Sequence, residues 1–254
     1  MYDKIKEGLI NGNKDHKSFE ELIRDSIRFT FKKPVVLLFL GVFLFIVEFI
    51  NDIFVEELDN PLSFVLIVIL LVLSIILAIY ESGYSYLIFE KSIEGLSIPP
   101  SLFNYKEILH HGIKDFAVVF VYVAIMLTIQ MFISHLEHTL FYESYSFFLK
   151  SLSSFIGGFL ISLMFIALIN LAFNKGEFKS AFNFKELFQI LYNVGLLRFI
   201  VILFIIDLAD FLMVHNIGFF QNPIILVINV FLVLIITPSL LLFSKRLLIM
   251  SALH

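Results

Sequence analysis

Six stretches of about 20 apolar residues divide this chain of 254 residues. The hydrocarbon core of a bilayer is about 30 Å thick and needs roughly 20 residues of helix to cross it, so each stretch predicts a transmembrane helix. Hydrophobic residues make up 59% of the chain and charged residues 16%, whereas a soluble domain has about half and about a quarter. We therefore expect an all-α polytopic membrane protein, a single membrane domain over residues 1–254, with six spans at about 34–55, 62–88, 116–134, 147–173, 197–216 and 222–244.

Prolines mark the beginnings of three spans. Pro34, Pro61 and Pro223 stand at or just before these starts, where a missing backbone N–H costs nothing. Pro238 instead falls inside the sixth span. It predicts a kink, and the carbonyl that it leaves without a donor must be satisfied by a neighbour.

Basic residues lie almost entirely on one side of the predicted spans. All of the 18 Lys and Arg residues except Lys150 lie in the N-terminal segment, in the loops after the second and fourth spans, or near the end of the sixth. Because basic residues accumulate on the cytoplasmic side, we expect both termini in the cytoplasm of a multi-pass cell-membrane protein, with residues 1–17 as a cytoplasmic tail. The net charge of -4 argues against a nucleic-acid partner.

Three predicted cytoplasmic segments share a pattern. Each has an aromatic residue, a Glu two positions later and then an aliphatic residue, as FEEL, YKEI and FKEL. If the aromatic residue is counted as position 0, positions 3, 4 and 7 of each segment are also apolar or small. Residues at these four positions lie on one face of a helix. Short amphipathic helices of this kind lie along a membrane interface and bury the apolar face at the acyl boundary. The three faces are Phe19, Leu22, Ile23 and Ser26; Tyr105, Ile108, Leu109 and Gly112; and Phe184, Leu187, Phe188 and Leu191.

The outgoing spans also end alike. Phe, any residue and Lys occur as FEK from Phe89, FNK from Phe173 and FSK from Phe243. The opening and closing patterns predict three pseudo-repeats, each an interfacial amphipathic helix followed by a transmembrane hairpin. The units cover about 18–91, 104–175 and 183–245. All three have one orientation, so the symmetry axis is expected along the membrane normal, unlike the inverted repeats of many transporters.

Two segments carry a resemblance to a known family. DSIRFTFKKPVVLLFLGVF, from Asp25, and GYSYLIFEKSIEGLSIPPSLFNYKEILHHGIKDF, from Gly83, are similar to the archaeal integral-membrane family called domain of unknown function 4013. The chain departs from the family pattern at Phe29 to Phe31, where Tyr-Pro is usual, and at Ile113, where Leu is usual. The resemblance implies an archaeal cell membrane and brings no activity and no functional residues.

Five acidic residues lie within the apolar spans, and four of them, all outside the inner half of the second span that holds Glu81, form one candidate group. Asp207 and Asp210 stand three positions apart in IIDLADFL, and Glu48 and Asp52 share a face of the first span. Charges inside a bilayer are costly and usually face a bundle interior or water, so we expect both aspartates to point inward. The candidate cation or proton site consists of Glu48, Asp52, Asp207 and Asp210, with His135 and His138 at its outer rim.

The same acids also have a structural explanation. Protonated carboxyls would hydrogen-bond to polar side chains on neighbouring helices, among them Asn170 and Asn229, without binding any ligand. A hydrolytic metal site at His135 and His138 is a third possibility. It is disfavoured because HLEH lacks the HExxH spacing in which the Glu acts as base.

Other small and polar residues indicate packing rather than chemistry. Glu81 stands beside Ser82 and Gly83 and predicts a packing face at a close helix contact, since small residues let helices approach. Gly157 and Gly158 in SSFIGGFLIS predict another such contact, with a hinge as the alternative. His110 and His111 lie on the polar face of the second amphipathic segment. We expect both imidazoles to be solvated.

No sequence motif identifies a reaction. The nucleophile elbow, phosphate loop, kinase signature and dinucleotide fingerprint do not occur, and a chain without Cys has no thiolate metal site. We expect no catalytic residue and no cofactor. The repeated amphipathic helix favours a membrane scaffold or lipid-interacting protein, with membrane lipids and cytoplasmic-face proteins as partners. The alternatives are a cation- or proton-coupled transporter or channel and a membrane-embedded metal-dependent enzyme.

Overall fold

The computed structural model describes residues 17–59, 64–140, 146–216 and 231–254. Every regular element in these ranges is helical, which confirms the all-α prediction. The elements are α2 (Phe19–Phe31), α3 (Pro34–Asp59), α4 (Phe64–Ile93), α5 (Tyr105–Leu140), α6 (Ser146–Phe173), the 3-10 helix η2 (Phe178–Phe182), α7 (Phe184–Val194), α8 (Leu196–Asn216), the π-helix η3 (Leu232–Ile236) and α10 (Thr237–Leu253).

The described helices are long and apolar enough for a membrane protein with four to six spans. Four helices qualify alone: Val65–Ile93, Tyr105–Leu136, Leu149–Phe173 and Leu232–Leu253. Two further spans are possible if each of two bent helix pairs counts as one span: α2 with α3, bent by 80°, and α7 with α8, bent by 92°.

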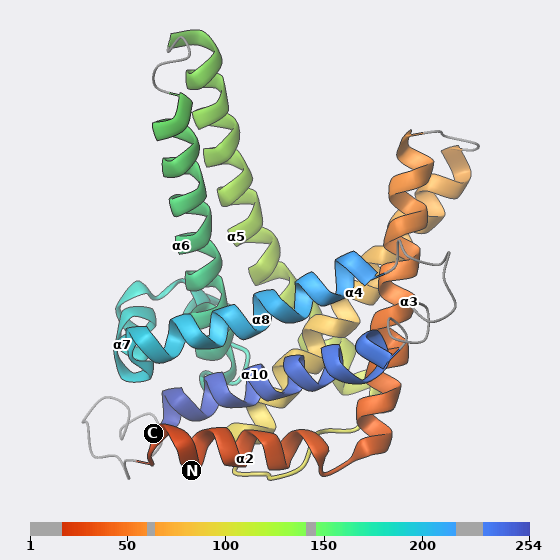
Figure 1. The fold of residues 1–254 in the computed structure, drawn as a ribbon, viewed down its shortest axis with the longest axis vertical. Helices are drawn as coiled ribbons and strands as arrows, with labels where there is room; N and C mark the ends of the chain where they lie inside the picture. Colours follow the sequence, from red (N-terminus) through yellow and green to blue (C-terminus); the bar gives the residue numbers. More distant parts are fainter. Residues whose placement is uncertain (1–16, 60–63, 141–145, 217–230) are drawn as a thin grey trace.

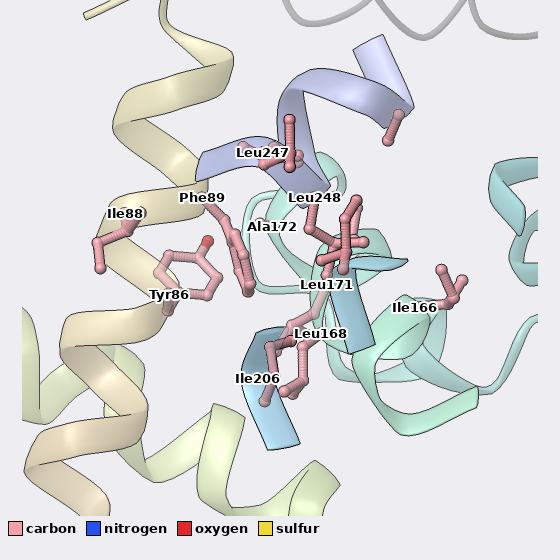
Figure 2. Packing of buried hydrophobic residues seen from close by; sticks show 14 of the residues in the cluster. Tyr86, Ile88, Phe89, Ile166, Leu168, Leu171, Ala172, Ile206, Leu247 and Leu248 are labelled. Atoms are coloured by element: carbon pink, nitrogen blue, oxygen red, sulfur yellow. The ribbon is translucent and has the colours of Figure 1, made fainter. Parts of the chain in front are cut away.

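The core is centred on α10, which packs against α2, α3, α4, α7 and α8. Leu247 and Leu248 of α10 are almost fully buried. They belong to one apolar cluster with Phe89 of α4, Leu171 of α6 and Ile206 of α8 (Figure 2). Burial of α10 from several sides explains why an ordinary apolar helix period is missing from its sequence.

The three predicted hairpins do not share one direction. In Figure 1, the α3–α4 and α5–α6 hairpins rise toward the top and splay apart, while α8 and α10 run across the view beneath them. In addition, α5 is one continuous helix from Tyr105, so the second unit has no separate interfacial helix. The threefold repeat about one axis is therefore not confirmed.

The apolar face of α2 is covered by protein rather than by lipid. The helix begins with a capping box, in which Glu21 N–H donates to Ser18 Oγ and Ser18 N–H donates to Glu21 Oε2. Leu22 and Ser26 are fully buried, and α2 lies along α10 (Figure 1). The expectation that this face meets the acyl boundary is wrong, because a buried helix of the same protein supplies the apolar surface first.

The kink predicted at Pro238 takes the form of a π-helix. Pro238 has no N–H to donate to the carbonyl of Leu234 four residues earlier, and the residues before it, Leu232–Ile236, form η3. The carbonyl oxygen of Leu234 faces Gly41 of α3, where any added methyl group would overlap it. A glycine on the neighbouring helix thus lets the two backbones come into direct contact at the proline break.

Helices α4 and α5 make the closest of the predicted glycine contacts. A methyl group at Gly83 would overlap the carbonyl of Ile108 and lie 2.9 Å from the Gly112 nitrogen, so the contact predicted at Gly83 is confirmed. At Gly157 of α6, an added methyl group would lie 3.2 Å from Nε2 of Gln130 on α5, so the close contact predicted there is confirmed. At Gly158 it would meet nothing within 4 Å, so the contact predicted there is wrong. The register of α4 against α5 is fixed by backbone contact, which positions the polar residues at the ends of both helices.

Candidate functional site

The structure describes two side chains of the predicted acid site and its rim, those of Asp207 and His135. The side chains of Glu48, Asp52, Asp210 and His138 lie outside the described part of the structure. Asp207 of α8 is exposed rather than interior, which corrects the expectation that it points inward. His135 on α5 is also exposed. Convergence of the four carboxylates therefore stays a prediction.

Asp207 lies at the edge of an apolar cavity between α5, α6 and α8. The cavity has a volume of about 300 Å³. Its lining includes Tyr122 and Met126 of α5 and Met164 and Phe165 of α6. Asp207 is the one carboxylate among the lining residues, so a ligand in this cavity would meet an apolar wall and a single acid.

Helix α7 is apolar over two adjoining parts of its surface. Leu187, Ile190 and Val194 are buried against the protein, and α7 packs on α6, α8 and α10. The other part carries Phe184, Phe188 and Tyr192, spaced four residues apart, which are 54%, 49% and 86% exposed. Protein thus covers only half of the apolar surface predicted for this helix.

The exposed half of α7 adjoins further aromatic and basic residues. Phe178 of η2 is exposed, as are Lys179 on η2 and Lys185 on α7. Leu196 and Leu197, at the start of α8, are also exposed. We call Phe178, Lys179, Phe184, Lys185, Phe188 and Tyr192 the α7 surface.

The bend after α7 is set by Gly195. This residue has φ 82°, and its N–H donates to the carbonyl of Leu191 at 3.1 Å. Left-handed backbone of this kind favours glycine, which commonly ends a helix. The next residue, Leu196, begins α8 at 92° to α7. If α8 crosses a bilayer, α7 runs along its surface.

A buried amide holds η2 and α7 onto α6. Nδ2 of Asn170 donates to the carbonyl of Ser180 at 2.7 Å and to Oε2 of Glu186 at 3.1 Å. Nδ2 of Asn174 donates to the same Glu186 oxygen at 3.3 Å. Asn170 does bond to a carboxylate, as the structural explanation of the acids required, but to one on α7 rather than inside a span.

A second polar cluster joins the end of α4 to the start of α5. One ligand atom each from Glu90, Glu107 and His111 lies within 4.8 Å of the others. The ring of His111 stacks on Tyr86, with centroids 4.4 Å apart and planes at 9°, and its Nδ1 is buried without a hydrogen-bond partner among the described residues. The expectation that His111 is simply solvated is wrong, whereas His110 is exposed.

Lys91 provides positive charge beside this cluster. Its Nζ lies 3.2 Å from Glu94, 3.8 Å from Glu107 and 3.9 Å from Glu90. A cavity of about 180 Å³ opens next to it. The lining of that cavity includes Lys33, Lys91, Asn104 and Glu107.

The sequence patterns contained a signal for both clusters. Glu107 and Glu186 hold the same position in their opening patterns, and each contacts the closing pattern of the preceding hairpin. Glu107 lies 3.8 Å from Lys91 in FEK, and Glu186 accepts a hydrogen bond from Asn174 in FNK. Pairing the repeated Glu with the preceding FxK would have identified both contacts.

Comparison with known proteins gives a family and no relative of known activity. No curated protein and no solved structure matches the chain. The family model described as "Protein of unknown function (DUF4013)" matches residues 62–237, more than half of the 254 residues. The match includes α4 to α8 and therefore both polar clusters and the α7 surface. The chain belongs to the DUF4013 family.

Proposed function

We propose that this protein is a membrane scaffold that binds anionic lipid headgroups through the α7 surface. One observation carries the proposal: an exposed aromatic face lies beside two exposed lysines, at a 92° bend into an apolar helix. The scaffold function predicted from the sequence depended on three interfacial helices. Here it depends on α7, because the apolar face of α2 is buried and α5 has no bend.

The chemistry of the α7 surface fits the boundary between acyl chains and headgroups. Aromatic side chains concentrate at that depth, and an amphipathic helix buries its apolar face there while its basic residues face the phosphates. A lysine near an anionic membrane surface contributes about 1 kcal/mol. Lys179 and Lys185 therefore supply enough attraction to favour anionic over zwitterionic lipid. Because basic residues mark the cytoplasmic side, we assign this lipid to the inner leaflet of the cell membrane.

The test compares the stability of the full chain in nanodiscs of phosphatidylcholine with and without phosphatidylglycerol. The wild type is expected to melt at a higher temperature with phosphatidylglycerol, and added salt should reduce this gain because it screens exposed charges. The double variant Lys179→Gln/Lys185→Gln should lose most of the gain. The control is Lys150→Gln, an exposed lysine at the far end of α6, which should keep it. An equal gain in all three proteins would contradict lipid binding at α7.

A cation- or proton-coupled transporter is the second candidate. It is favoured by the position of Asp207 at the edge of the cavity between α5 and α6. Replacement Asp207→Asn preserves the shape of the side chain, removes its charge and replaces one acceptor oxygen with an amide donor. Transport of a cation into proteoliposomes should be lost in this variant with folding intact. A fully folded Asp207→Asn protein with unchanged flux would exclude a role for this carboxylate.

A further inference from the structure

We propose that Glu90, Glu107 and His111 bind a divalent transition-metal ion. The inference is independent of lipid binding at α7, since it concerns the junction of α4 and α5. Glu107 and His111 are one helical turn apart on α5 and share a face, and Glu90 faces them from the last turn of α4.

The three ligands stand on rigid elements. Backbone contact at Gly83 and Gly112 fixes α4 against α5, and Gly112 directly follows His111. The imidazole is further held by the Tyr86 ring, whose side chain is only 1% exposed. A metal site requires this kind of support, because ligands on loosely held side chains lose affinity.

The spacing and the donor types fit one ion. Zinc holds nitrogen and oxygen ligands at about 2.0–2.2 Å, so two ligand atoms on one ion lie at most about 4.4 Å apart. The ligand atoms of the cluster lie within 4.8 Å of one another, and small side-chain rotations would bring them onto an ion. One imidazole and two carboxylates suit Zn²⁺, Fe²⁺ or Mn²⁺ better than Ca²⁺ or Mg²⁺, which prefer oxygen ligands only.

Two features point to a cation. Nδ1 of His111 is buried and has no hydrogen-bond partner among the described residues, a state that costs free energy unless a hydrogen-bond partner or, for the unprotonated nitrogen, a metal satisfies it. In addition, Glu90, Glu94 and Glu107 all lie within 4 Å of the Lys91 ammonium, the one cation that pairs with them among the described residues, and it lies closest to Glu94 at 3.2 Å. Glu107 also accepts a hydrogen bond from Nδ2 of Asn104 through Oε2. Lys91 can stay on Glu94 while an ion joins the other two carboxylates. The adjoining cavity of about 180 Å³ provides an entry path.

The experiment is calorimetric titration of Zn²⁺ into the untagged full chain, purified in detergent after treatment with a chelator. Glu107→Gln and His111→Gln should each weaken binding at least about tenfold. His110→Gln is the matched control, because His110 is the exposed neighbour of His111, and it should leave the affinity unchanged. Lys91→Gln should tighten binding, since it removes the competing ammonium; misfolding cannot produce this gain.

The outcomes separate clearly. Absence of Zn²⁺ binding by the wild type overturns the proposal, and so does equal affinity in wild type, Glu107→Gln and His111→Gln. If those two variants do not fold, the Lys91→Gln protein decides, and unchanged or weaker binding in its folded form contradicts the site. A Zn²⁺ affinity that falls only in His110→Gln would place the ion elsewhere and also contradict the proposal.

Discussion

Arg246 of α10 donates two hydrogen bonds to one carboxylate oxygen of Asp25 in α2, from Nε at 3.2 Å and from Nη2 at 3.0 Å. The same guanidinium donates to the carbonyl of Leu96 at 3.1 Å and lies over the ring of Phe29. Its side chain is 3% exposed, and that of Asp25 is 36% exposed. One buried cation therefore ties α2, the α4–α5 loop and α10 together.

Arg246→Met should destabilise the protein by about 1.5–3 kcal/mol, because it removes charge-assisted hydrogen bonds to Asp25; water reaches part of the Asp25 carboxylate and compensates part of its charge. Unfolding in mixed micelles with increasing SDS measures the difference. Arg24→Met is the matched control: Arg24 pairs with Glu20 at 3.0 Å on the exposed face of α2, the helix that carries Asp25, and exposed pairs contribute about 0–1 kcal/mol. Equal losses in the two variants would show that burial of Arg246 is unimportant.

Gly112→Ala should destabilise the α4–α5 junction by about 1–3 kcal/mol, the usual range for an overpacked contact. The new methyl group would overlap the carbonyl of Ile79, and the backbone of α4 cannot rotate away as a side chain can. Gly158→Ala, where the methyl group meets nothing within 4 Å, should be neutral or stabilising by up to about 1 kcal/mol, since Ala favours helix. Thermal unfolding of the two variants in one detergent provides the comparison, and a reversed order would refute the described contact.

Asn170→Asp should destabilise the attachment of α7 at neutral pH. The substitution replaces the amide that donates to Ser180 and Glu186 with a carboxylate facing two acceptors, and buried groups left without a partner cost about 1–3 kcal/mol each. Lowering the pH should reduce the loss, because protonation of either carboxyl restores a donor. Asn183→Asp is the control: Asn183 is exposed and its side chain makes no capping hydrogen bond. A loss that does not depend on pH would contradict this explanation.

The sequence predicts the helical class, the apolar spans and the starts of α2, α5 and α7 because these follow from local periodicity. The sequence does not predict which apolar helix faces are covered by other helices of the protein. The patterns at Phe19 and Phe184 are alike, yet Ile23 is partly buried against the core while Phe188, at the equivalent position, is exposed. That difference depends on where α10 packs, which no local pattern contains.

The two polar clusters around Glu107 and Glu186 also depend on how the helices pack, which the sequence patterns alone do not predict. Glu90 and Glu107 were each visible within a repeated pattern, but their contact depends on the crossing of α4 and α5 at Gly83 and Gly112. The acids of the spans predict a site because charge is rare inside a bilayer. Asp207, the one acid of the candidate site whose side chain the structure describes, is exposed rather than buried.

The most direct test of the central claim is the depth of α7 in a bilayer. The chain has no Cys, so a single spin label at Phe188→Cys or Lys185→Cys reports one position without background. We predict that the label at 188 is more accessible to oxygen, which concentrates among acyl chains, and the label at 185 to a water-soluble nickel chelate. Equal high accessibility of both labels to the chelate would place α7 in water and contradict lipid binding through the α7 surface.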